Sequence, residues 1–366
     1  MFKFNSKVIL IAMLVLSLGL FSAGCGDQQS NQSGEKEKDL KVAFVYCGAK
    51  DDFGWATVQE KARKGLVDIY PNVEFTAVEN IPEGSDSART FTQLCEQGYG
   101  VIIASSFGYQ DAVHDVAAKY PDVKFIHCVG NKTADNVSTY FGKMYQLRYL
   151  SGILAGKITK TNTIGHVAAF PVPACIGGLN AFALGVQSVN PDAVIKVVWT
   201  NTWYDPATEK EAAKSLLDTG ADIISMHQDT PQGLIAASER GCYGIGYDND
   251  MTSFAPDHAI TSLCWDWTKI FKDEIQAVLD GTWKSRRIFP GLEVDGFLQL
   301  APYGPMVPDD AKQLVEEKMQ LIASQEWDVF TGPIKDKDGN IVVKEGQKLT
   351  DDEIWSMSWI VEGVKE

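Results

Sequence analysis

Short apolar runs alternate with amphipathic stretches along most of this chain, and the whole pattern occurs twice. The apolar runs of the first half are 41–46, 72–78, 101–104 and 123–127. The amphipathic stretches between them are 58–69, 85–96 and 110–119. Strands that alternate with helices of this length predict βαβ units and a parallel sheet. The pattern restarts after residue 160, with apolar runs at 163–169, 195–199, 223–226 and 243–246. The chain therefore predicts two α/β lobes in series.

Two parallel sheets in series also predict where a small molecule would bind. In open α/β sheets, ligands bind outside the carboxyl ends of the strands. Small-molecule sites are also common at the interface between two domains. We assign residues 40–145 to an N-terminal lobe, with a returning segment near 265–290. Residues 146–260 form a C-terminal lobe with much of 291–366, and the ligand cleft is expected between the lobes.

The first residues are typical of an export signal. Lys3 and Lys7 precede a short apolar run at 8–21, and about 20 apolar residues are needed to cross a bilayer. The run ends on Ser22-Ala-Gly-Cys25, which resembles the lipobox of bacterial lipoproteins, although Leu is usual where Ser22 stands. The resemblance implies a signal peptide at 1–24 and a lipidated Cys25, with 25–39 as a polar, flexible tether. An ordinary cleaved signal with an incidental cysteine is the alternative.

Charge and cysteine spacing exclude several classes of partner. The formal net charge is −15, which argues against nucleic acid, because phosphate binding needs a basic surface. It does not argue against a neutral base or nucleoside. The six cysteines after Cys25 are scattered, with no CxxC pair, so we expect buried free thiols and no metal site. One or two disulfides are the alternative.

No motif in the chain predicts catalysis. The sequence contains no GxSxG, GxxxxGK[ST], HExxH or GxGxxG signature at the expected place. The set Ser105, His227 and Asp229 has no spacing that selects it as a hydrolytic centre. The stretch Asp336–Gly339 lacks the ligand spacing of a calcium loop and is interpreted as the turn of a hairpin. We therefore expect neither catalytic residues nor a cofactor.

Aromatic and polar residues stand just after nearly every predicted strand. Exposing large aromatic side chains is unfavourable, so a repeated set of them has either a packing role or a binding role. Any one of them alone is as well explained by packing, but the set favours a flat ligand with polar edges. Stacking contributes about 1–3 kcal/mol per base, and carboxylate or amide oxygens would accept hydrogen bonds from its edge. The candidate ligand-binding residues in these loops are Phe53, Trp55, Phe107, Phe170, Asn201, Trp203, Asp229 and Asp248.

Read in order, these loops resemble the basic membrane protein family of bacterial substrate-binding lipoproteins. Members of that family serve ABC importers for purine nucleosides and nucleobases. The resemblance runs from about Leu40 to Val364. It is most specific in Phe53-Gly-Trp55, Ser106-Phe-Gly-Tyr109, Gly177-Gly-Leu-Asn-Ala-Phe182, Asn201-Thr-Trp-Tyr-Asp-Pro206 and Met357-Ser-Trp-Ile-Val-Glu-Gly363. It implies a type I periplasmic-binding-protein fold that closes on a purine, and an ABC permease as partner.

The resemblance also implies roles for individual residues. Trp203 looks like the stacking aromatic of the second lobe, and Trp55 or Phe53 like that of the first. Asp248 stands where nucleoside-binding members place an Asp on the ribose hydroxyls. Nucleoside binders usually have a Lys after a Thr-Ser pair, which Thr261-Ser-Leu-Cys-Trp265 lacks. The Trp-rich loops, with Trp265 as a further candidate, resemble the nucleobase branch, so base and nucleoside both stay open.

The sequence thus predicts a monomeric, lipid-anchored solute-binding protein on the cell membrane, facing the outside or the periplasm. It would capture a purine nucleobase or nucleoside and deliver it to a permease. Three alternatives remain open on the residues alone. They are a protein that binds a sugar or another polar solute for uptake or chemoreception, a surface enzyme that acts on nucleosides, and a surface interaction protein.

Overall fold

Two β-sheets with the same strand pattern organise the chain. The computed structural model describes residues 39–366, so the predicted signal peptide at 1–24, the lipidation site Cys25 and nearly all of the tether at 25–39 lie outside the described residues. The first sheet has the order β11-β5-β4-β3-β1-β2, and all its neighbouring strands are parallel. Its strands are β1 (Leu40–Val45), β2 (Val73–Val78), β3 (Val101–Ala104), β4 (Lys124–Cys128), β5 (Val137–Tyr140) and β11 (Arg287–Ile288).

The second sheet repeats this arrangement with the order β12-β10-β9-β8-β6-β7-β15. All its neighbours are parallel except β12, which runs antiparallel to β10. Its strands are β6 (Thr163–Ala168), β7 (Val194–Trp199), β8 (Ile223–His227), β9 (Tyr243–Asp248), β10 (Ala259–Trp265), β12 (Leu298–Leu300) and β15 (Val364–Lys365). We call each sheet with its flanking helices a lobe, the N-lobe for the first and the C-lobe for the second.

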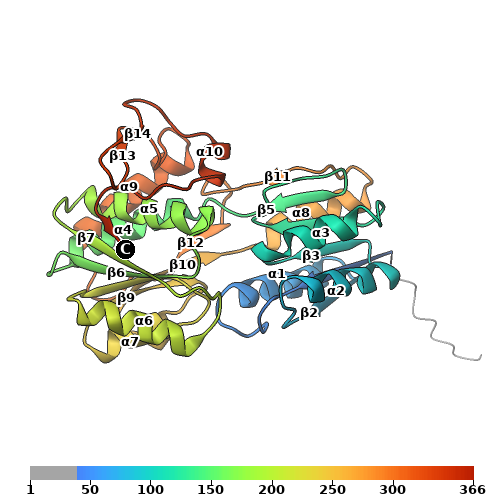
Figure 1. Cartoon of the computed structure of the whole chain (residues 1–366), viewed down its shortest axis with the longest axis horizontal. Coiled ribbons are helices and arrows are strands. Elements are labelled where there is room, and N and C mark those ends of the chain that lie inside the picture. The colour runs from blue at the N-terminus through green and yellow to red at the C-terminus, as the bar shows by residue number, and fades with distance from the viewer. Residues whose placement is uncertain (1–38) are drawn as a thin grey trace, which may run out of the picture. The chain divides into compact units, whose positions relative to one another are not determined.

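Helices cover both faces of each sheet. In the N-lobe, α1 and α8 pack together on one face, and α2 and α3 pack together on the other. In the C-lobe, α4 and α5 cover one face, and α6 and α7 the other (Figure 1). The helices are α1 (Trp55–Ile69), α2 (Ser85–Glu96), α3 (Gln110–Ala117), α4 (Tyr145–Ile158), α5 (Pro173–Gln187), α6 (Pro206–Asp218), α7 (Gln232–Glu239), α8 (Thr268–Leu279), α9 (Asp309–Ala323) and α10 (Asp351–Trp355). Two short 3-10 helices, η1 (Phe107–Tyr109) and η2 (Thr252–Phe254), complete the set in the described residues.

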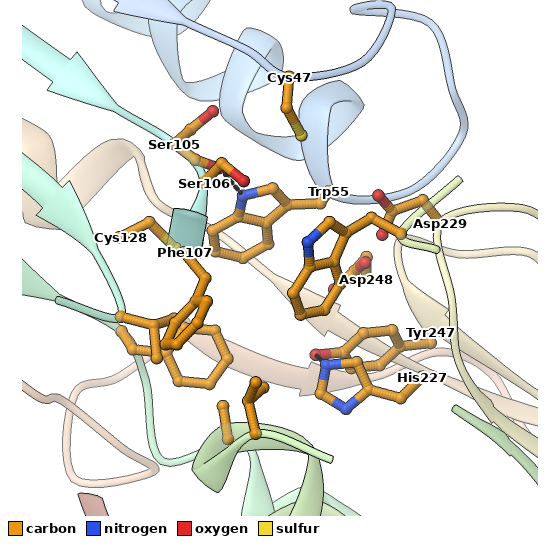
Figure 2. A pocket seen from close by; sticks show the side chains of 15 residues that line it. Cys47, Trp55, Ser105, Ser106, Phe107, Cys128, His227, Asp229, Tyr247 and Asp248 are labelled. Carbon is orange, nitrogen blue, oxygen red and sulfur yellow. Dashed lines mark hydrogen bonds between the residues drawn. The ribbon is translucent and has the colours of Figure 1, made fainter. Parts of the chain in front are cut away.

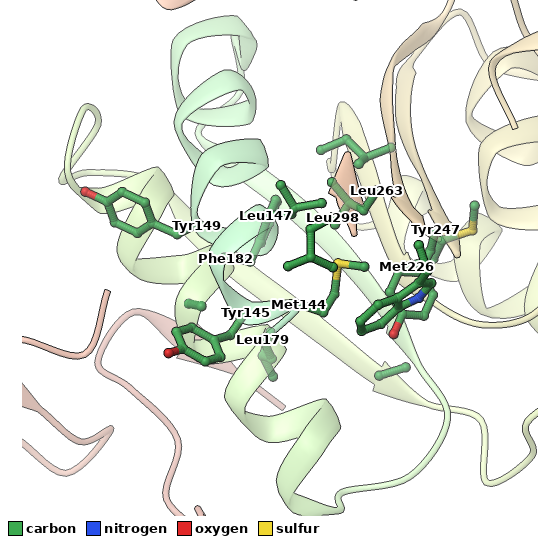
Figure 3. Close-up of a cluster of buried hydrophobic side chains, with 14 of the residues drawn as sticks. Met144, Tyr145, Leu147, Tyr149, Leu179, Phe182, Met226, Tyr247, Leu263 and Leu298 are labelled. Atoms are coloured by element: carbon green, nitrogen blue, oxygen red, sulfur yellow. The ribbon is translucent and has the colours of Figure 1, made fainter. Parts of the chain in front are cut away.

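Central strands are mostly apolar because both of their faces are covered. Side chains alternate across a strand, so in β1 Val42 and Phe44 join a core with α1 and α8. Ala43 and Val45 join a separate core under α2 and α3. In the C-lobe, Leu147 of α4 and Phe182 of α5 pack over the sheet together with strand residues such as Leu298 (Figure 3). This burial on both faces explains why the strand segments of the sequence are largely apolar rather than strictly alternating.

The chain crosses between the two sheets more than once. It leaves the N-lobe after β5, returns with α8 and β11, and ends in the C-lobe, where β15 pairs with β7. The described residues, 39–366, all belong to one compact unit. The tail contains the antiparallel pair β13 (Ile334–Lys335) and β14 (Ile341–Val343), which confirms the predicted hairpin. No helix in the described part of the chain is long and apolar enough to span a membrane.

The stretch between the two halves contains α4, whose residues from Tyr145 to Gly156 are all buried. A helix that is buried all round has no polar face, and therefore lacks the 3.6-residue periodicity that marks a surface helix. The predicted α/β class with parallel sheets is confirmed.

Candidate ligand-binding site

A pocket lies at the strand ends of both sheets, next to the point where the strand order reverses. In the N-lobe β1 lies between β2 and β3, and in the C-lobe β6 lies between β7 and β8. In open α/β sheets, ligands bind at such a reversal. The pocket has an empty volume of about 510 Å³, part of which is open to solvent. Figure 2 shows the labelled side chains around it. Its lining residues are Cys47, Trp55, Ser105, Ser106, Phe107, Cys128, Val129, Phe141, Val172, Ala174, Trp203, His227, Asp229, Tyr247 and Asp248.

Both lobes contribute a tryptophan to the pocket, and each is held from behind. The indole Nε1 of Trp55 donates to the backbone oxygen of Ser105 at 2.8 Å. The same ring meets the edges of Trp265 and Trp267, with centroids 5.8 and 5.7 Å away. Trp203 packs against Phe170 with a centroid distance of 5.0 Å. These contacts hold the two large, flat indole rings in their orientations.

Asp248 presents a buried carboxyl group at the end of β9. The indole Nε1 of Trp265 donates to its Oδ1 at 2.7 Å, while its Oδ2 is buried and has no hydrogen-bond partner in residues 39–366. The backbone of Asp248 has φ of 65°, in the left-handed region that costs a non-glycine residue free energy. Val129, also in the pocket wall, has φ of 51°. Such strain concentrates at functional sites.

Burial keeps the acidic groups of the pocket protonated to higher pH. Removal from water raises the pKa of Asp248 to about 8, against a hydrogen bond from Trp265 that lowers it. Burial also raises the pKa of Asp229 well above its ordinary value, and the nearby charges of Asp52 and Asp248 raise it further. At neutral pH Asp248 therefore has a proton to donate to a ligand, and can also accept a hydrogen bond.

The raised pKa of Asp248 predicts a pH-dependent stability. The folded protein holds a proton on this group up to about pH 8, while the unfolded chain releases it near 3.8. The folded state therefore binds more protons between these values, and the free energy of unfolding should fall from pH 7 to pH 8. Burial lowers the pKa of His127, His166 and His227, so these groups are neutral throughout that window.

Chemical denaturation at pH 7.0, 7.5 and 8.0 measures this effect. We expect Asp248→Asn to reduce the loss of unfolding free energy over this range by about 1 kcal/mol. Burial also raises the pKa of Glu209 to about 7. This group adds a further loss of unfolding free energy over the same pH range, and the loss is shared by the wild type and Asp248→Asn. Parallel pH profiles for the wild type and Asp248→Asn would contradict the proposed protonation of Asp248.

The loop before α1 brings the two lobes into contact. Asp52 caps the helix: its Oδ1 accepts from the backbone of Gly54 at 2.8 Å, and its Oδ2 from that of Ala56 at 3.0 Å. This places Gly54 against Asp229 of the C-lobe, so closely that a Cβ on Gly54 would overlap the backbone Cα and carbonyl oxygen of Asp229. The contact closes one side of the cleft, and only glycine permits it.

The structure brings five of the nine predicted ligand-binding residues together in the pocket wall. Trp55 and Phe107 come from the N-lobe, and Trp203, Asp229 and Asp248 from the C-lobe. The other four lie outside the lining. Phe53 is 51% exposed and contacts Phe254, and Asn201 is an exposed residue with φ of 56°. Phe170 packs against Trp203. Trp265 donates a hydrogen bond to Asp248.

The remaining lining residues were not selected from the sequence. Ser105, Ser106, His227 and Tyr247 stand in or beside the same strand-end loops, so the carboxyl-end rule applied to every loop position would have found them. Phe141 follows β5, a strand of sequence Val-Ser-Thr-Tyr that has no apolar run to mark it. Cys47 and Cys128 are small apolar-like residues with no signal of their own.

The pocket does not assemble a hydrolytic centre from Ser105, His227 and Asp229. The hydroxyl of Ser105 donates to the backbone oxygen of Val45 at 2.9 Å, and Nε2 of His227 lies 3.1 Å from the hydroxyl of Tyr247. Within residues 39–366 no hydrogen bond links the three. All six cysteines of this range are free, as expected, and burial raises the pKa of Cys47 to about 12. That thiol is therefore protonated at neutral pH.

Two lobes whose strand ends face one pocket define the class of two-lobed solute-binding proteins. Residues 39–332 match the model of the PnrA-like ABC transporter substrate-binding protein family (Bmp), and the chain belongs to this family. A purine-binding protein of Brucella abortus is 44% identical over 331 residues, which cover 90% of this chain and 94% of that protein. A Haloferax volcanii protein named for glucose binding in an ABC transporter is 37% identical over 84% of this chain and 78% of its own length.

Solved structures show the same fold. A solute-binding protein of an ABC transporter system from Aeropyrum pernix has a TM-score of 0.68 and 20% identity, over 81% of this chain and 93% of its own. One from Conexibacter woesei has a TM-score of 0.64 and 22% identity, over 79% and 98%. The expected type I periplasmic-binding-protein fold and the expected family are thereby confirmed.

Proposed function

We propose that this protein captures a purine nucleobase or nucleoside in the cleft and delivers it to the permease of an ABC importer. The observation that carries the proposal is the pocket itself, where Trp55, Phe107 and Trp203 offer flat apolar faces beside the carboxyl groups of Asp229 and Asp248. A purine has two π-faces and an edge of hydrogen-bond donors and acceptors, so it matches both parts. The 44% identical purine-binding protein of Brucella abortus supports the same ligand class.

In this proposal the five predicted residues that line the pocket have separate roles. Trp55 and Trp203 contact the faces of the ring system, and Phe107 fills its remaining apolar side. The unpartnered Oδ2 of Asp248 forms a hydrogen bond with a ring nitrogen or a ribose hydroxyl of the ligand. Asp229 forms a hydrogen bond with a second polar edge. Binding alone accounts for these groups, so we propose no catalytic step. Phe53, Phe170 and Asn201 act on the rim or behind it rather than on the ligand.

The proposal places the protein outside the cytoplasm, anchored by a lipid on Cys25, with a monomer as the working unit. This location and this anchor are proposed because residues 1–24 are typical of a signal peptide and the residues up to Cys25 resemble a lipobox. The polar tether at 25–39 would let the binding unit reach a membrane permease.

Sugar uptake is the second candidate, because the 37% identical relative is named as a glucose-binding protein. Sugars also stack on aromatic rings and engage carboxylates, so the pocket residues alone admit them. A panel of ligands separates the two proposals. We expect adenine, hypoxanthine or guanosine at 100 times its dissociation constant to add about 2.7 kcal/mol to the stability of the purified protein. A thermal shift with glucose or ribose and none with any purine would contradict the purine proposal.

A further inference from the structure

A second pocket adjoins the first on the side of α4 and α5. It has an empty volume of about 430 Å³. Four residues line both pockets, so the two share a wall: Val129, Phe141, Ala174 and His227. Arg148, Gly177 and Gly178 belong to the second pocket alone. A ligand in the first pocket therefore lies next to a space whose charged group is Arg148.

Arg148 is a fully buried cation without a carboxylate partner. It lies on α4 with no exposed surface, and no acidic group within residues 39–366 forms an ion pair with it. Its Nη1 donates to the backbone oxygen of Met226 at 2.7 Å, and its guanidinium carbon lies 4.1 Å from the centre of the Tyr247 ring. The other two nitrogens, Nε and Nη2, are buried and have no hydrogen-bond partner there. Leaving an arginine in this state is costly unless another group satisfies it.

The two unpartnered nitrogens form one edge of the guanidinium plane. The N–H bonds of Nε and Nη2 are parallel, and this fork matches two neighbouring acceptor atoms. The space beside Gly178 adjoins this edge: a Cβ on Gly178 would lie 3.6 Å from Nε and 3.7 Å from Nδ1 of His227. That Nδ1 is also buried without a partner, while Nε2 of the same ring meets Tyr247. Three unpartnered polar atoms thus border the junction of the pockets.

We propose that Arg148 binds a pair of acceptor atoms on the captured ligand, through the fork of Nε and Nη2, in the space beside Gly178. The inference rests on the proposed purine function and narrows it to ligands with such a pair. Two sources supply this chemistry. The O6 and N7 atoms of a 6-oxopurine form the pair that arginine recognises in guanine. An anionic oxygen group attached to a purine, such as a phosphate, offers the same fork-shaped partner.

Calorimetric titration of Arg148→Lys with hypoxanthine, adenine and adenosine monophosphate distinguishes these sources. Lysine keeps the charge and removes the fork. A loss of at least tenfold confined to hypoxanthine supports the oxopurine edge, because adenine has an amino donor in place of O6. A loss confined to the monophosphate supports the anionic group. Equal losses for all three, or affinities within twofold of wild type, would overturn the proposal. If the wild-type protein binds no purine, the proposed function itself has failed.

Gly178→Ala tests the same space with Arg148 intact. The new methyl group would make only ordinary contacts, and alanine favours a helix over glycine, so the unliganded protein should be at least as thermally stable as wild type. Its affinity for the selected ligand should nevertheless fall about tenfold, because the methyl group occupies the space that Nε adjoins. Gly48→Ala is the control, since Gly48 lines neither pocket and its methyl group would meet only Oδ2 of Asp52, at 3.9 Å. Equal effects of the two substitutions on affinity would contradict the assignment to Arg148.

Discussion

Gly54→Ala should weaken ligand binding by about a hundredfold. The added methyl group would overlap the backbone of Asp229 in the opposite lobe, and backbone atoms have no rotamer by which to escape. Overpacking of this kind costs about 1–3 kcal/mol, and we expect the upper end because both overlapping atoms are backbone. Each 1.4 kcal/mol changes a dissociation constant tenfold. The overlap is relieved when the lobes separate, so the cost falls on the closed, ligand-holding form.

Titration calorimetry with the purine that stabilises the wild type measures this loss. Gly48→Ala is the matched control, because its methyl group would meet only Oδ2 of Asp52, at 3.9 Å. That variant should bind within about twofold of wild type. Thermal unfolding without ligand should be similar for all three proteins, which separates a failure to close from a failure to fold. Wild-type affinity in Gly54→Ala would show that the contact with Asp229 is not needed for binding.

Trp203→Ala should weaken purine binding by about 1–3 kcal/mol, which is roughly five- to 150-fold. The indole lines the pocket and is partly buried, with Phe170 behind it, so its loss removes a stacking face without opening the core of either lobe. Trp203→Phe keeps an aromatic face and should recover most of the affinity. Unchanged binding in Trp203→Ala would remove the stacking role from the account.

Tyr204→Ala is the control for this position. Tyr204 is the next residue, has 43% of its surface exposed and is not part of the pocket lining. Replacing it changes the same loop and removes a similar aromatic group, so we expect affinity within about twofold of wild type. If both substitutions weaken binding equally, the loop rather than the indole of Trp203 is what matters.

The sequence predicted the sheets well because their strands are buried on both faces. Short, largely apolar runs marked β1, β3 and β8, and the predicted helix at 85–96 coincides with α2. Prediction failed where local signals were weak. α4 is buried almost all round, so it lacks the amphipathic pattern that marked helices such as α2.

The site was predictable in outline, and its chemistry depends on contacts that no single-chain pattern reveals. The strand-end rule selected Trp55, Trp203 and Asp248, which share one pocket wall. That Trp265 would bind Asp248 depends on the register of β9 beside β10. The position of Arg148 over Tyr247 likewise depends on how α4 packs on the second sheet. Such long-range contacts set the charge of the pocket and cannot be read from neighbours in the sequence.

A crystal structure of the protein grown with the purine that stabilises it most is the most direct test of the central claim. The account predicts one purine in the cleft, with its ring faces against Trp55 and Trp203 and a polar atom within hydrogen-bond distance of Asp248 Oδ2. A purine bound elsewhere, with the cleft closed around a different molecule such as a sugar, would contradict it.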